Sequence, residues 1–563
     1  MTLRPLALRR TAACALLTAV IAATAGCGAA NDAPQPTPDA DVTPPADSIG
    51  ERIFLDTRFS EYFATHMTGI NDPLAAGDPA VVTVPTTNGS LPGPFAGQAM
   101  NCRSCHFVTE FQGVAGAGNR TYSDFTTRSP IPRPMEGFDH TPRNSSQMVD
   151  SFTARSGPVF LHHDGEFTSG IDLVKGTMTA RNFGWLPSEY QQAVAHIARV
   201  IREDNGSDQL AADRTNGLSY STLFLGTDSR ITSDLQLPAS ERLDVTKATD
   251  DQILDEVALC INQYMEDLLF ARDEYGRYTG SPFDNFIRVN HLPQQPLAGQ
   301  TRADYNQKLL KEVLALKNPI YISDADGSYK YHSFSYQFGA KELQGLIIFL
   351  TAASNASDGS QHAGNCAACH QAPDFSDFVF HNTGTSQAEY DGLHGSGAFL
   401  ALAVPSLAAR NANFNAYLPA SANHPDASES FRRAASVDNP NYADLGLWNV
   451  YLNPDMPKPQ SALYGFVCAT GNDCSVDQGL ASTIAQFKTP VLRDLADSAP
   501  YFHNGAALDL DAVIDQYIRM SALARQGAMR NPPPEFKNMS ISASDRDALV
   551  AFLMALTEDY DDA

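Results

Sequence analysis

Two pentapeptides, at residues 102–106 and 366–370, share the pattern Cys-x-x-Cys-His. Two thiols at this spacing lie about one helical turn apart, so they can bond to the vinyl groups of a porphyrin while the adjacent imidazole reaches the iron. The pattern is the attachment sequence of a c-type haem, and two copies in one chain indicate two haems. We therefore predict two covalently attached haem c groups. The thioether residues are Cys102, Cys105, Cys366 and Cys369, and the adjacent iron ligands are His106 and His370.

The N-terminus has the pattern of an export signal. Arg4, Arg9 and Arg10 form a positive segment, and residues 11–25 form a short apolar run. The run ends in Thr24-Ala-Gly-Cys27, which resembles a bacterial lipobox. We therefore predict a periplasmic protein that is anchored to the bacterial membrane by a lipid on Cys27. Ordinary cleavage of the signal nearby is the alternative.

The other cysteines are interpreted from their surroundings. Cys14 lies in the predicted signal. Cys468 and Cys474 are close in sequence, and we expect them to form a small disulfide loop in an oxidising compartment. Cys260 lies within an apolar helical pattern, which predicts a buried and inert thiol.

Length and charge limit the class of protein. The chain has 563 residues, which is too long for a single hydrophobic core, so two or more domains are expected. Its 39 Lys and Arg residues against 64 Asp and Glu residues give a net charge of −25. This balance argues against a nucleic-acid partner and suits a basic electron donor. No further long apolar run predicts a membrane span.

The elements that position the two motifs are predicted to be helices. Apolar residues recur at helical spacing in 187–201, 250–273, 303–316 and 340–353. The segment 340–353 is similar to the one that begins at Ile49, which suggests a duplicated haem-binding unit. We predict a mostly α fold with two haem domains and an enlarged helical connection. The expected boundaries are signal peptide 1–26, flexible tether 27–48, N-terminal haem domain 49–215, connection 216–335 and C-terminal haem domain 336–563.

Several phrases, taken in order, resemble the bacterial dihaem cytochrome c peroxidase and MauG superfamily over nearly the whole mature chain. In that family each half is a mostly helical, cytochrome c-like domain. The matching phrases are both haem motifs, Gly50…Phe54-Leu-Asp56…Arg58-Phe-Ser60, Pro142-Arg-Asn144, Asp164-Gly165, Phe380-His-Asn-Thr-Gly384, Asp444-Leu-Gly446 and Thr489-Pro-Val-Leu-Arg493…Ala499-Pro-Tyr-Phe-His-Asn-Gly505.

The resemblance implies a division of labour between the haems. The C-terminal haem takes in electrons and has two axial ligands, and the N-terminal haem is where peroxide is cleaved. His106 and His370 match the proximal ligands. The second ligand of the C-terminal haem is Met in the peroxidases and Tyr in MauG-like proteins, and the matching position here is Tyr517. Met520, one turn further on, is the alternative.

Two departures from the family pattern affect the peroxide site. The family has Trp between the haems, where this chain has His163 before Asp164-Gly165. The family also uses a Glu about twenty residues further on to move a proton, but residues 179–185 contain no carboxylate. His140, His162, His163 and Arg181 are the candidate replacements, and an apolar site that binds O2 is the alternative.

The family also binds a calcium ion between its domains. The matching positions are Asn144, Ser498, where Thr is usual, and the carbonyl of Pro500. Oxygen ligands of this kind suit a hard cation.

The leading functional hypothesis is a dihaem oxidoreductase that reduces hydrogen peroxide with electrons relayed from the C-terminal to the N-terminal haem. The alternatives are a MauG-like or rubber-oxygenase-like enzyme that oxidises an organic or protein substrate, with peroxide or O2, and a pure electron-transfer protein. A small soluble donor, such as a cytochrome c or a cupredoxin, is the expected partner. The resemblance also suggests a homodimer.

Overall fold

The computed structural model describes residues 44–72, 83–86, 89–92, 100–112, 120–126, 128–130, 140–152, 157–323, 335–353, 362–468 and 474–558. The chain divides into two units, 1–38 and 39–563, and all the described residues belong to the second unit. The predicted signal, Cys14 and the lipid-anchor residue Cys27 therefore lie outside the described residues. In the described ranges, no helix has the length and hydropathy that a membrane span requires.

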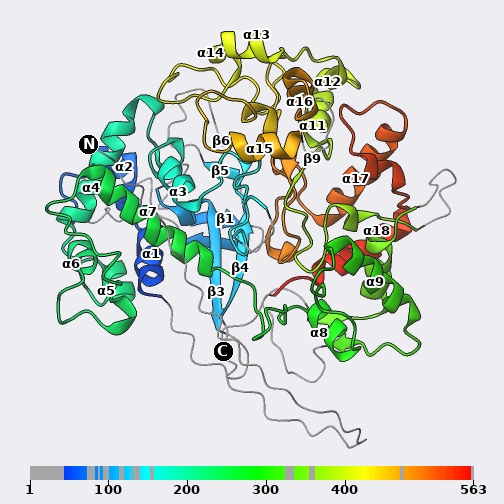
Figure 1. Cartoon of the computed structure of the whole chain (residues 1–563), viewed down its shortest axis with the longest axis horizontal. Helices are drawn as coiled ribbons and strands as arrows, with labels where there is room; N and C mark the ends of the chain where they lie inside the picture. The colour runs from blue at the N-terminus through cyan, green and yellow to red at the C-terminus, as the bar shows by residue number, and fades with distance from the viewer. Residues whose placement is uncertain are drawn as a thin grey trace, which may run out of the picture. The chain divides into compact units, whose positions relative to one another are not determined.

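The fold is mostly helical, as predicted (Figure 1). The helices are α1 Pro45–Leu55, α2 Glu61–His66, α3 Gly170–Met178, α4 Tyr190–Glu203, α5 Gln209–Thr215, α6 Tyr220–Leu225, α7 Asp250–Asp267, α8 Pro282–Val289, α9 Arg302–Ala315, α10 Ala340–Leu350, α11 Thr385–His394, α12 Ala398–Ala401, α13 Leu407–Ala412, α14 Phe414–Tyr417, α15 Gln460–Val467, α16 Val476–Ser482, α17 Leu510–Arg525 and α18 Ala543–Met554.

The strands within the described ranges form two-stranded antiparallel pairs. Strand β9 pairs with β10, which places His381 opposite Phe487 and joins two of the family phrases. The strands are β1 Thr83–Thr86, β2 Gly89–Pro92, β3 His106–Gln112, β4 Arg120–Thr126, β5 Arg128–Pro130, β6 His140–Asn144, β7 Ile322–Ser323, β8 Gln337–Phe338, β9 Phe380–His381 and β10 Phe487–Lys488.

Helix α1 begins earlier than the end of the predicted tether. The tether was expected to reach residue 48, but α1 starts at Pro45, and Ala46 and Asp47 are already buried. Proline suits this position because its fixed φ matches the first helical turn and its missing N–H leaves no bond unmade.

The two opening helices, α1 and α10, pack in the same way. Both carry the sequence Gly-x-x-Ile-Phe-Leu, at 50–55 and 345–350. A Cβ on Gly50 would lie 2.1 Å from the carbonyl oxygen of Cys260 in α7, and one on Gly345 would lie 1.9 Å from that of Ala548 in α18. Each helix therefore crosses its partner through a glycine, as expected for a duplicated unit.

The main hydrophobic cores follow this division. One core joins α1, α3, α4 and α7, and includes the buried thiol of Cys260, as predicted. The other joins α8, α9, α10 and α18. Figure 1 shows α1, α4 and α7 gathered on one side and α9, α17 and α18 on the other. Residues 216–335 therefore contribute helices to both cores, and their boundaries as a separate connection stay a prediction.

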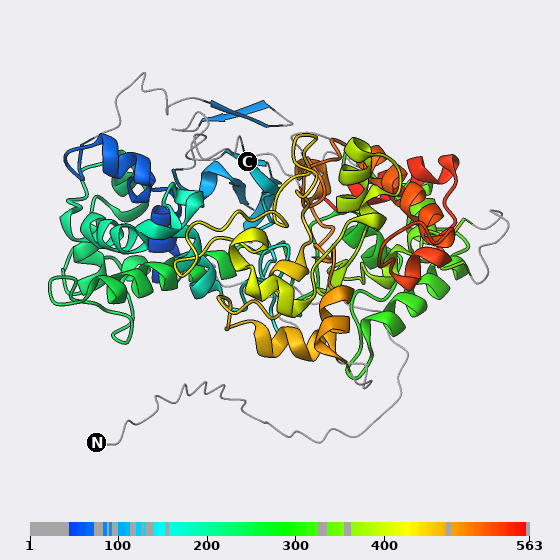
Figure 2. The ribbon, with the colours of Figure 1, turned by 90° about the horizontal axis from the view of Figure 1, so that it is seen from above.

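A third core lies in the segment between the second haem motif and β10. Phe399, Leu445, Trp448, Tyr451 and Leu480 are among its buried members. The predicted disulfide between Cys468 and Cys474 is present beside this core. Figure 2 shows the segment, in yellow and orange, extending from the C-terminal half toward α3. It thereby brings charged side chains to the first haem half.

Candidate haem and peroxide sites

The second haem motif lies at the edge of a large cavity. A short 3-10 helix spans Cys366–Ala368, and neither Cys366 nor Cys369 is in a disulfide. Both line the cavity together with His370. The Nδ1 atom of His370 lies 3.0 Å from the carbonyl oxygen of Phe375, to which it donates. This bond fixes the ring orientation, and burial lowers the pKa of His370, so the imidazole is neutral as a metal ligand requires.

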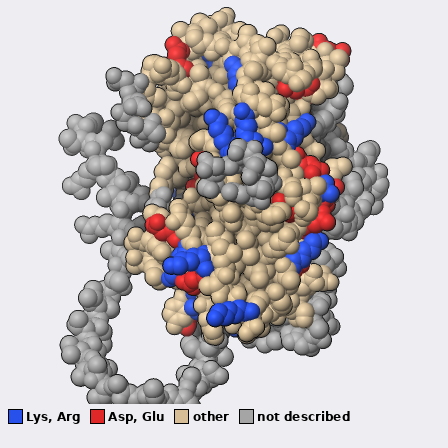
Figure 3. All heavy atoms as spheres, turned by 90° about the vertical axis from the view of Figure 1, so that its right-hand side faces the viewer, with Lys and Arg blue, Asp and Glu red and all other residues tan. Residues whose placement is uncertain are grey.

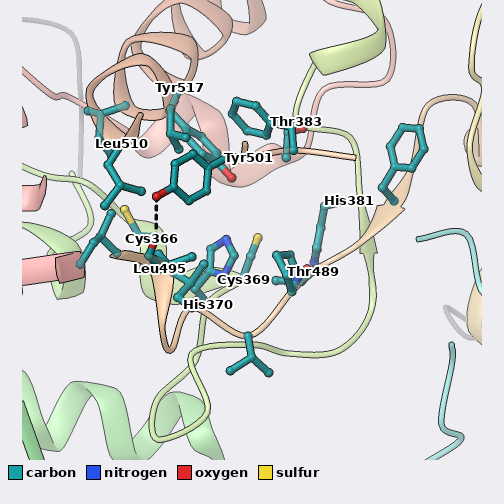
Figure 4. A pocket seen from close by; sticks show the side chains of 18 of the residues that line it. Cys366, Cys369, His370, His381, Thr383, Thr489, Leu495, Tyr501, Leu510 and Tyr517 are labelled. Carbon is teal, nitrogen blue, oxygen red and sulfur yellow. Dashed lines mark hydrogen bonds between the residues drawn. The ribbon is translucent and has the colours of Figure 1, made fainter. Parts of the chain in front are cut away.

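Tyr517 faces His370 across this cavity. Figure 4 shows the two side chains entering from opposite sides, with Cys366 and Cys369 beside His370. Helix α17, which carries Tyr517, begins after Asp509, whose carboxylate accepts a hydrogen bond from the backbone N–H of Ala512 at 2.8 Å. Burial, with smaller contributions from the two thiols, raises the pKa of Tyr517. Much of the remaining wall is apolar, as a porphyrin requires, and includes Phe349, Leu492, Leu495, Val513, Ile514 and Leu553.

Met520 does not line this cavity. Its side chain is buried against Gly384, where an added Cβ would lie 2.2 Å from the terminal methyl carbon of Met520. It belongs to a small core with Ala524, Met529, Phe536 and Met539. The structure therefore places Tyr517, and not Met520, opposite His370, although the ligand assignment itself stays a prediction.

The first haem motif offers a comparable set of donors. A short 3-10 helix begins at Cys102, Cys105 follows it, and neither thiol is in a disulfide; His106 comes next, at the start of β3. The Nδ1 atom of His106 is buried and has no hydrogen-bond partner among the described residues. Burial, with a smaller contribution from His162, lowers the pKa of His106 to about 4. A neutral imidazole beside two cysteines that are not in disulfides fits covalent haem attachment.

His162 and His163 lie on a tight turn that opens α3. The backbone of Leu161 pairs with that of Phe167, and Gly165 has a φ of 73° that favours glycine. His163 Nε2 lies 3.0 Å from the carbonyl oxygen of Asn144, and the ring lines the second cavity. His163 is thus at the wall of the second site, and His162 contributes to the lowered pKa of His106.

Arg143 anchors this turn through an ion pair with Asp164. Its Nη1 atom lies 2.5 Å from Oδ2 of Asp164, and its Nε atom lies 2.6 Å from Oδ2 of Asp444 in the third core segment. Burial raises the pKa of Asp444, but the guanidinium of Arg143 outweighs burial and lowers it to about 2. Asp444 is therefore ionised, and Arg143 links the two halves through its contacts with both carboxylates.

The other sequence-predicted residues occupy different surroundings. Arg181 forms an ion pair with Glu429, so its guanidinium is engaged with the third core segment. His140 begins β6, where its backbone pairs with Pro130, and its side chain lies outside the described residues. His163 and Arg181 thus contact different residues, Asn144 and Glu429.

Glu166 is a carboxylate that the sequence reasoning missed. Its Oε2 atom lies 3.1 Å from Nδ1 of His162 and 2.7 Å from Nη2 of Arg432. Burial would raise the pKa of Glu166, but Arg432 and His162 hold it well below its usual range. The signal in the sequence is its position directly after Asp164-Gly165, whereas the family pattern places the carboxylate at 179–185.

The predicted calcium residues Asn144, Ser498 and Pro500 all line the second cavity. The side-chain amide of Asn144 donates to the carbonyl oxygen of Pro500 at 2.5 Å, and both residues line the second cavity. The hydroxyl of Ser498 instead donates to the carbonyl oxygen of Asp494 at 2.7 Å. The Oδ1 atom of Asn144 accepts a hydrogen bond from the backbone N–H of Ser145 at 3.1 Å, and amide, hydroxyl and carbonyl oxygens are ligands that suit calcium. The ion itself stays a prediction.

Three curated proteins match the sequence. A cytochrome-c peroxidase, IdrP2, from Denitromonas iodatirespirans is 29% identical over 199 residues, which are 34% of this chain and 36% of that protein. The methylamine utilization protein MauG from Methylorubrum extorquens is 42% identical over 72 residues, 12% of this chain and 18% of that protein. The resemblance to the dihaem cytochrome c peroxidase and MauG superfamily is confirmed. A second cytochrome-c peroxidase, IdrP1, from a Pseudomonas strain is 29% identical over 127 residues, 22% of this chain and 30% of that protein. The matches thus span about a third or less of each relative.

Solved structures of similar proteins align over most of the chain. A MauG-like protein associated with microbial copper homeostasis aligns over 93% of this chain and 92% of its own, at a TM-score of 0.39 and 14% identity. The diheme peroxidase BthA from Burkholderia thailandensis aligns over 91% of this chain and 86% of its own, also at 0.39 and 14%. No family model matches the chain.

Proposed function

We propose that this protein is a dihaem c-type oxidoreductase that reduces hydrogen peroxide at the N-terminal site with electrons relayed from the C-terminal site. The observation that carries the proposal is the second cavity, where Cys366, Cys369 and His370 face Tyr517. The haems supply the redox chemistry when bound. The chain's own residues bind them, exclude water and set the path between them.

The turn at 162–163 supports an electron path between the sites. His163 lines the second cavity, and its neighbour His162 is near His106. The two imidazoles are adjacent in the chain, and this dipeptide, at the position where the family has Trp, is the proposed link between the sites. The backbone is fixed here, since the N–H of Lys488 donates to the carbonyl oxygen of His163 at 2.7 Å.

The electron donor is proposed to be a small soluble cytochrome c or cupredoxin. Although the net charge is −25, the described acidic and basic side chains on the face seen in Figure 3 are sparse and interspersed. Docking on that face would depend on its uncharged surface more than on a concentrated acidic patch. A donor that docks on a concentrated acidic patch would instead give a strong dependence of its reaction rate on ionic strength.

The decisive experiment is stopped-flow absorbance of the purified protein, mixed with hydrogen peroxide in the half-reduced and the fully oxidised state. Rapid decay of the half-reduced form, with repeated oxidation of a reduced cytochrome, is the expected result. No reaction of either state with peroxide, together with a stable complex of the reduced protein with O2, would contradict the proposal and favour an oxygenase.

A second candidate function is MauG-like oxidation of an organic or protein substrate. It is favoured by Tyr517 in the cavity, because a phenolate ligand stabilises the oxidised state of a haem more than a thioether does. Slow turnover of the half-reduced form, with a long-lived oxidised species from the diferric form, would support this function over peroxide reduction.

The location and assembly are also proposals. We expect a periplasmic protein held at the membrane by a lipid on Cys27, a calcium ion at Asn144, Ser498 and Pro500, and a homodimer. Fractionation of cells that express Cys27→Ser tests the anchor, because the variant is expected to leave the membrane fraction.

A further inference from the structure

The turns at 161–167 and 501–507 have the same backbone geometry. In each, the first residue pairs with the seventh, and the second and fifth have positive φ. Helix α3 begins at Gly170 after one turn, and α17 begins at Leu510 after the other. The φ angles are 61° at His162, 73° at Gly165, 67° at Phe502 and 64° at Gly505.

This correspondence locates His162 relative to the first haem site. Phe502, at the same position of the second turn, lines the second haem cavity. If the haem units are duplicates, as α1 and α10 indicate, His162 occupies at the first haem motif the position that Phe502 has at the second. The effect of His162 on the charge of His106 agrees with this placement. Its side chain is 27% exposed, which leaves access for a small substrate.

We propose that His162, held in place by Glu166 and Arg432, is the proton-transfer residue of the first haem site. His162 Nδ1 lies 3.1 Å from Glu166 Oε2, and Arg432 Nη2 lies 2.7 Å from the same oxygen. Because Nδ1 donates to the carboxylate, Nε2 carries the lone pair that accepts a proton. This inference rests on the proposed function and supplies the group that residues 179–185 lack.

The proton bookkeeping of the reaction is H2O2 + 2 H+ + 2 e− → 2 H2O. His162 Nε2 accepts the proton of one peroxide oxygen and returns it to the other as the O–O bond breaks, so that the second oxygen leaves as water. The remaining oxygen becomes the second water with two electrons from the soluble donor and two protons from solvent. Glu166 and Arg432 are positioning residues, since they act through His162.

Arg432 reaches the site from the other half of the chain. It belongs to the third core segment, and its Nη2 atom is also 3.9 Å from Oδ2 of Asp164. The site is therefore completed only when that segment is docked, which Figure 2 shows as the yellow chain beside α3. Glu166 is 17% exposed and Arg432 18%, so solvent screens their interaction little.

The test compares His162→Phe, Glu166→Gln and Glu166→Asp with Asp172→Asn. Phenylalanine is accepted by this turn, since Phe502 occupies the same position of its counterpart. Asp172→Asn is the matched control, because Asp172 on α3 also pairs with the third core segment, through Lys458, at 2.5 Å. The measured quantities are the rate of cyanide binding to the oxidised holoprotein and peroxide-dependent oxidation of a reduced cytochrome. Hydrogen cyanide must lose its proton to bind, so its rate reports a base without catalysis.

We expect His162→Phe to slow both processes by about 100-fold and Glu166→Gln by about 10-fold. Glu166→Asp should recover part of the loss, and Asp172→Asn should match the wild type. If His162→Phe binds cyanide and turns over peroxide as fast as the wild type, the inference is overturned and the peroxidase function stays intact. Slower cyanide binding in His162→Phe, with no peroxide turnover by the wild type, would support His162 and overturn the peroxidase function.

Discussion

Tyr517 and Met520 lie one helical turn apart on α17, yet their side chains reach different places. Tyr517 projects into the haem cavity, and Met520 packs beneath Gly384 in a small core. The glycine accounts for the difference, since any larger residue at 384 would collide with the methionine. The identity of the residue opposite His370 is therefore set by packing on the far side of α17.

Replacing Tyr517 by Met is expected to raise the reduction potential of the second haem by on the order of 100 mV, because a thioether stabilises the reduced iron. Redox titration followed by absorbance measures this. Met520→Leu is the control and should leave the potential unchanged. If the haem absorbance spectrum changes in Met520→Leu but not in Tyr517→Met, Met520 is the axial ligand.

Glu558 is a fully buried acid that follows helix α18. Burial, together with Asp284, raises the pKa of Glu558 to about 8, and its Oε2 atom accepts a hydrogen bond from the N–H of Ala271 at 2.9 Å. An unfolded glutamate has a pKa of about 4.3. At pH values between these two pKa values, Glu558 keeps its proton in the folded state and has lost it in the unfolded state. The stability that this proton provides is complete below the unfolded pKa and is lost as pH rises through 8.

We predict that Glu558→Gln flattens this pH dependence and raises the Tm at pH 8 and above. The wild type should lose up to about 1 kcal/mol of unfolding free energy per pH unit in the window, and the amide keeps an acceptor for Ala271. Thermal unfolding between pH 5 and 9 measures the effect. The exposed Glu274→Gln serves as the control, and equal pH profiles for wild type and Glu558→Gln would refute the prediction.

At the scale of elements, the α1–α7 and α10–α18 crossings repeat one device. A glycine in the opening helix lets its backbone touch a carbonyl of the later helix, at Gly50 and at Gly345. Isoleucine, phenylalanine and leucine then follow in the same register and enter the two main cores. Each crossing positions the haem motif that follows its opening helix, and Asn101 Nδ2 donates to the carbonyl oxygen of Leu55 at 2.6 Å.

Gly345→Ala should lower the unfolding free energy by about 3 kcal/mol, because the added methyl group would meet the Ala548 carbonyl and force the helices apart. Gly465→Ala is the matched control, since Gly465 lies within α15 with open space around it, and should raise stability by up to about 1 kcal/mol. Denaturant unfolding of both variants measures the difference. Equal stabilities would mean that α10 and α18 can separate at little cost.

At the scale of the molecule, the third core segment joins the two halves by ion pairs. It starts in the C-terminal half, and four of its charged side chains meet partners in the first half. The pairs are Asp444 with Arg143, Glu429 with Arg181, Arg432 with Glu166, and Lys458 with Asp172. The most buried of them, at Arg143, also holds the turn that carries both histidines.

Arg143→Met is expected to destabilise the protein by about 3 to 5 kcal/mol, because it leaves Asp444 buried without its ion-pair partner and leaves Asp164 only the more distant Arg432, at 3.9 Å. Lys458→Met removes an exposed pair between the same segments and should cost under about 1 kcal/mol. Differential scanning calorimetry distinguishes the two. A similar loss in both variants would mean that water reaches the Arg143 site.

The sequence by itself determined the local features of this protein. The two haem motifs, the disulfide, the buried Cys260, the helical character and the acidic start of α17 each depend on neighbours within a few residues. Local patterns of that kind are set by spacing and helical periodicity. The phrases that resemble the family are local in the same way, since each consists of residues that are close together in the sequence.

Only the tertiary structure decided which residues meet. Met520 packs against Gly384 whereas Tyr517 lines the cavity, and Glu166 meets Arg432, which is far away in sequence. His163, a candidate for the peroxide site, proved to line the second cavity because Asn144 holds its ring. Such pairings depend on how distant segments dock, and burial then fixes the charge of each group. A single sequence carries no local signal for how distant segments dock or for which charge a buried group takes.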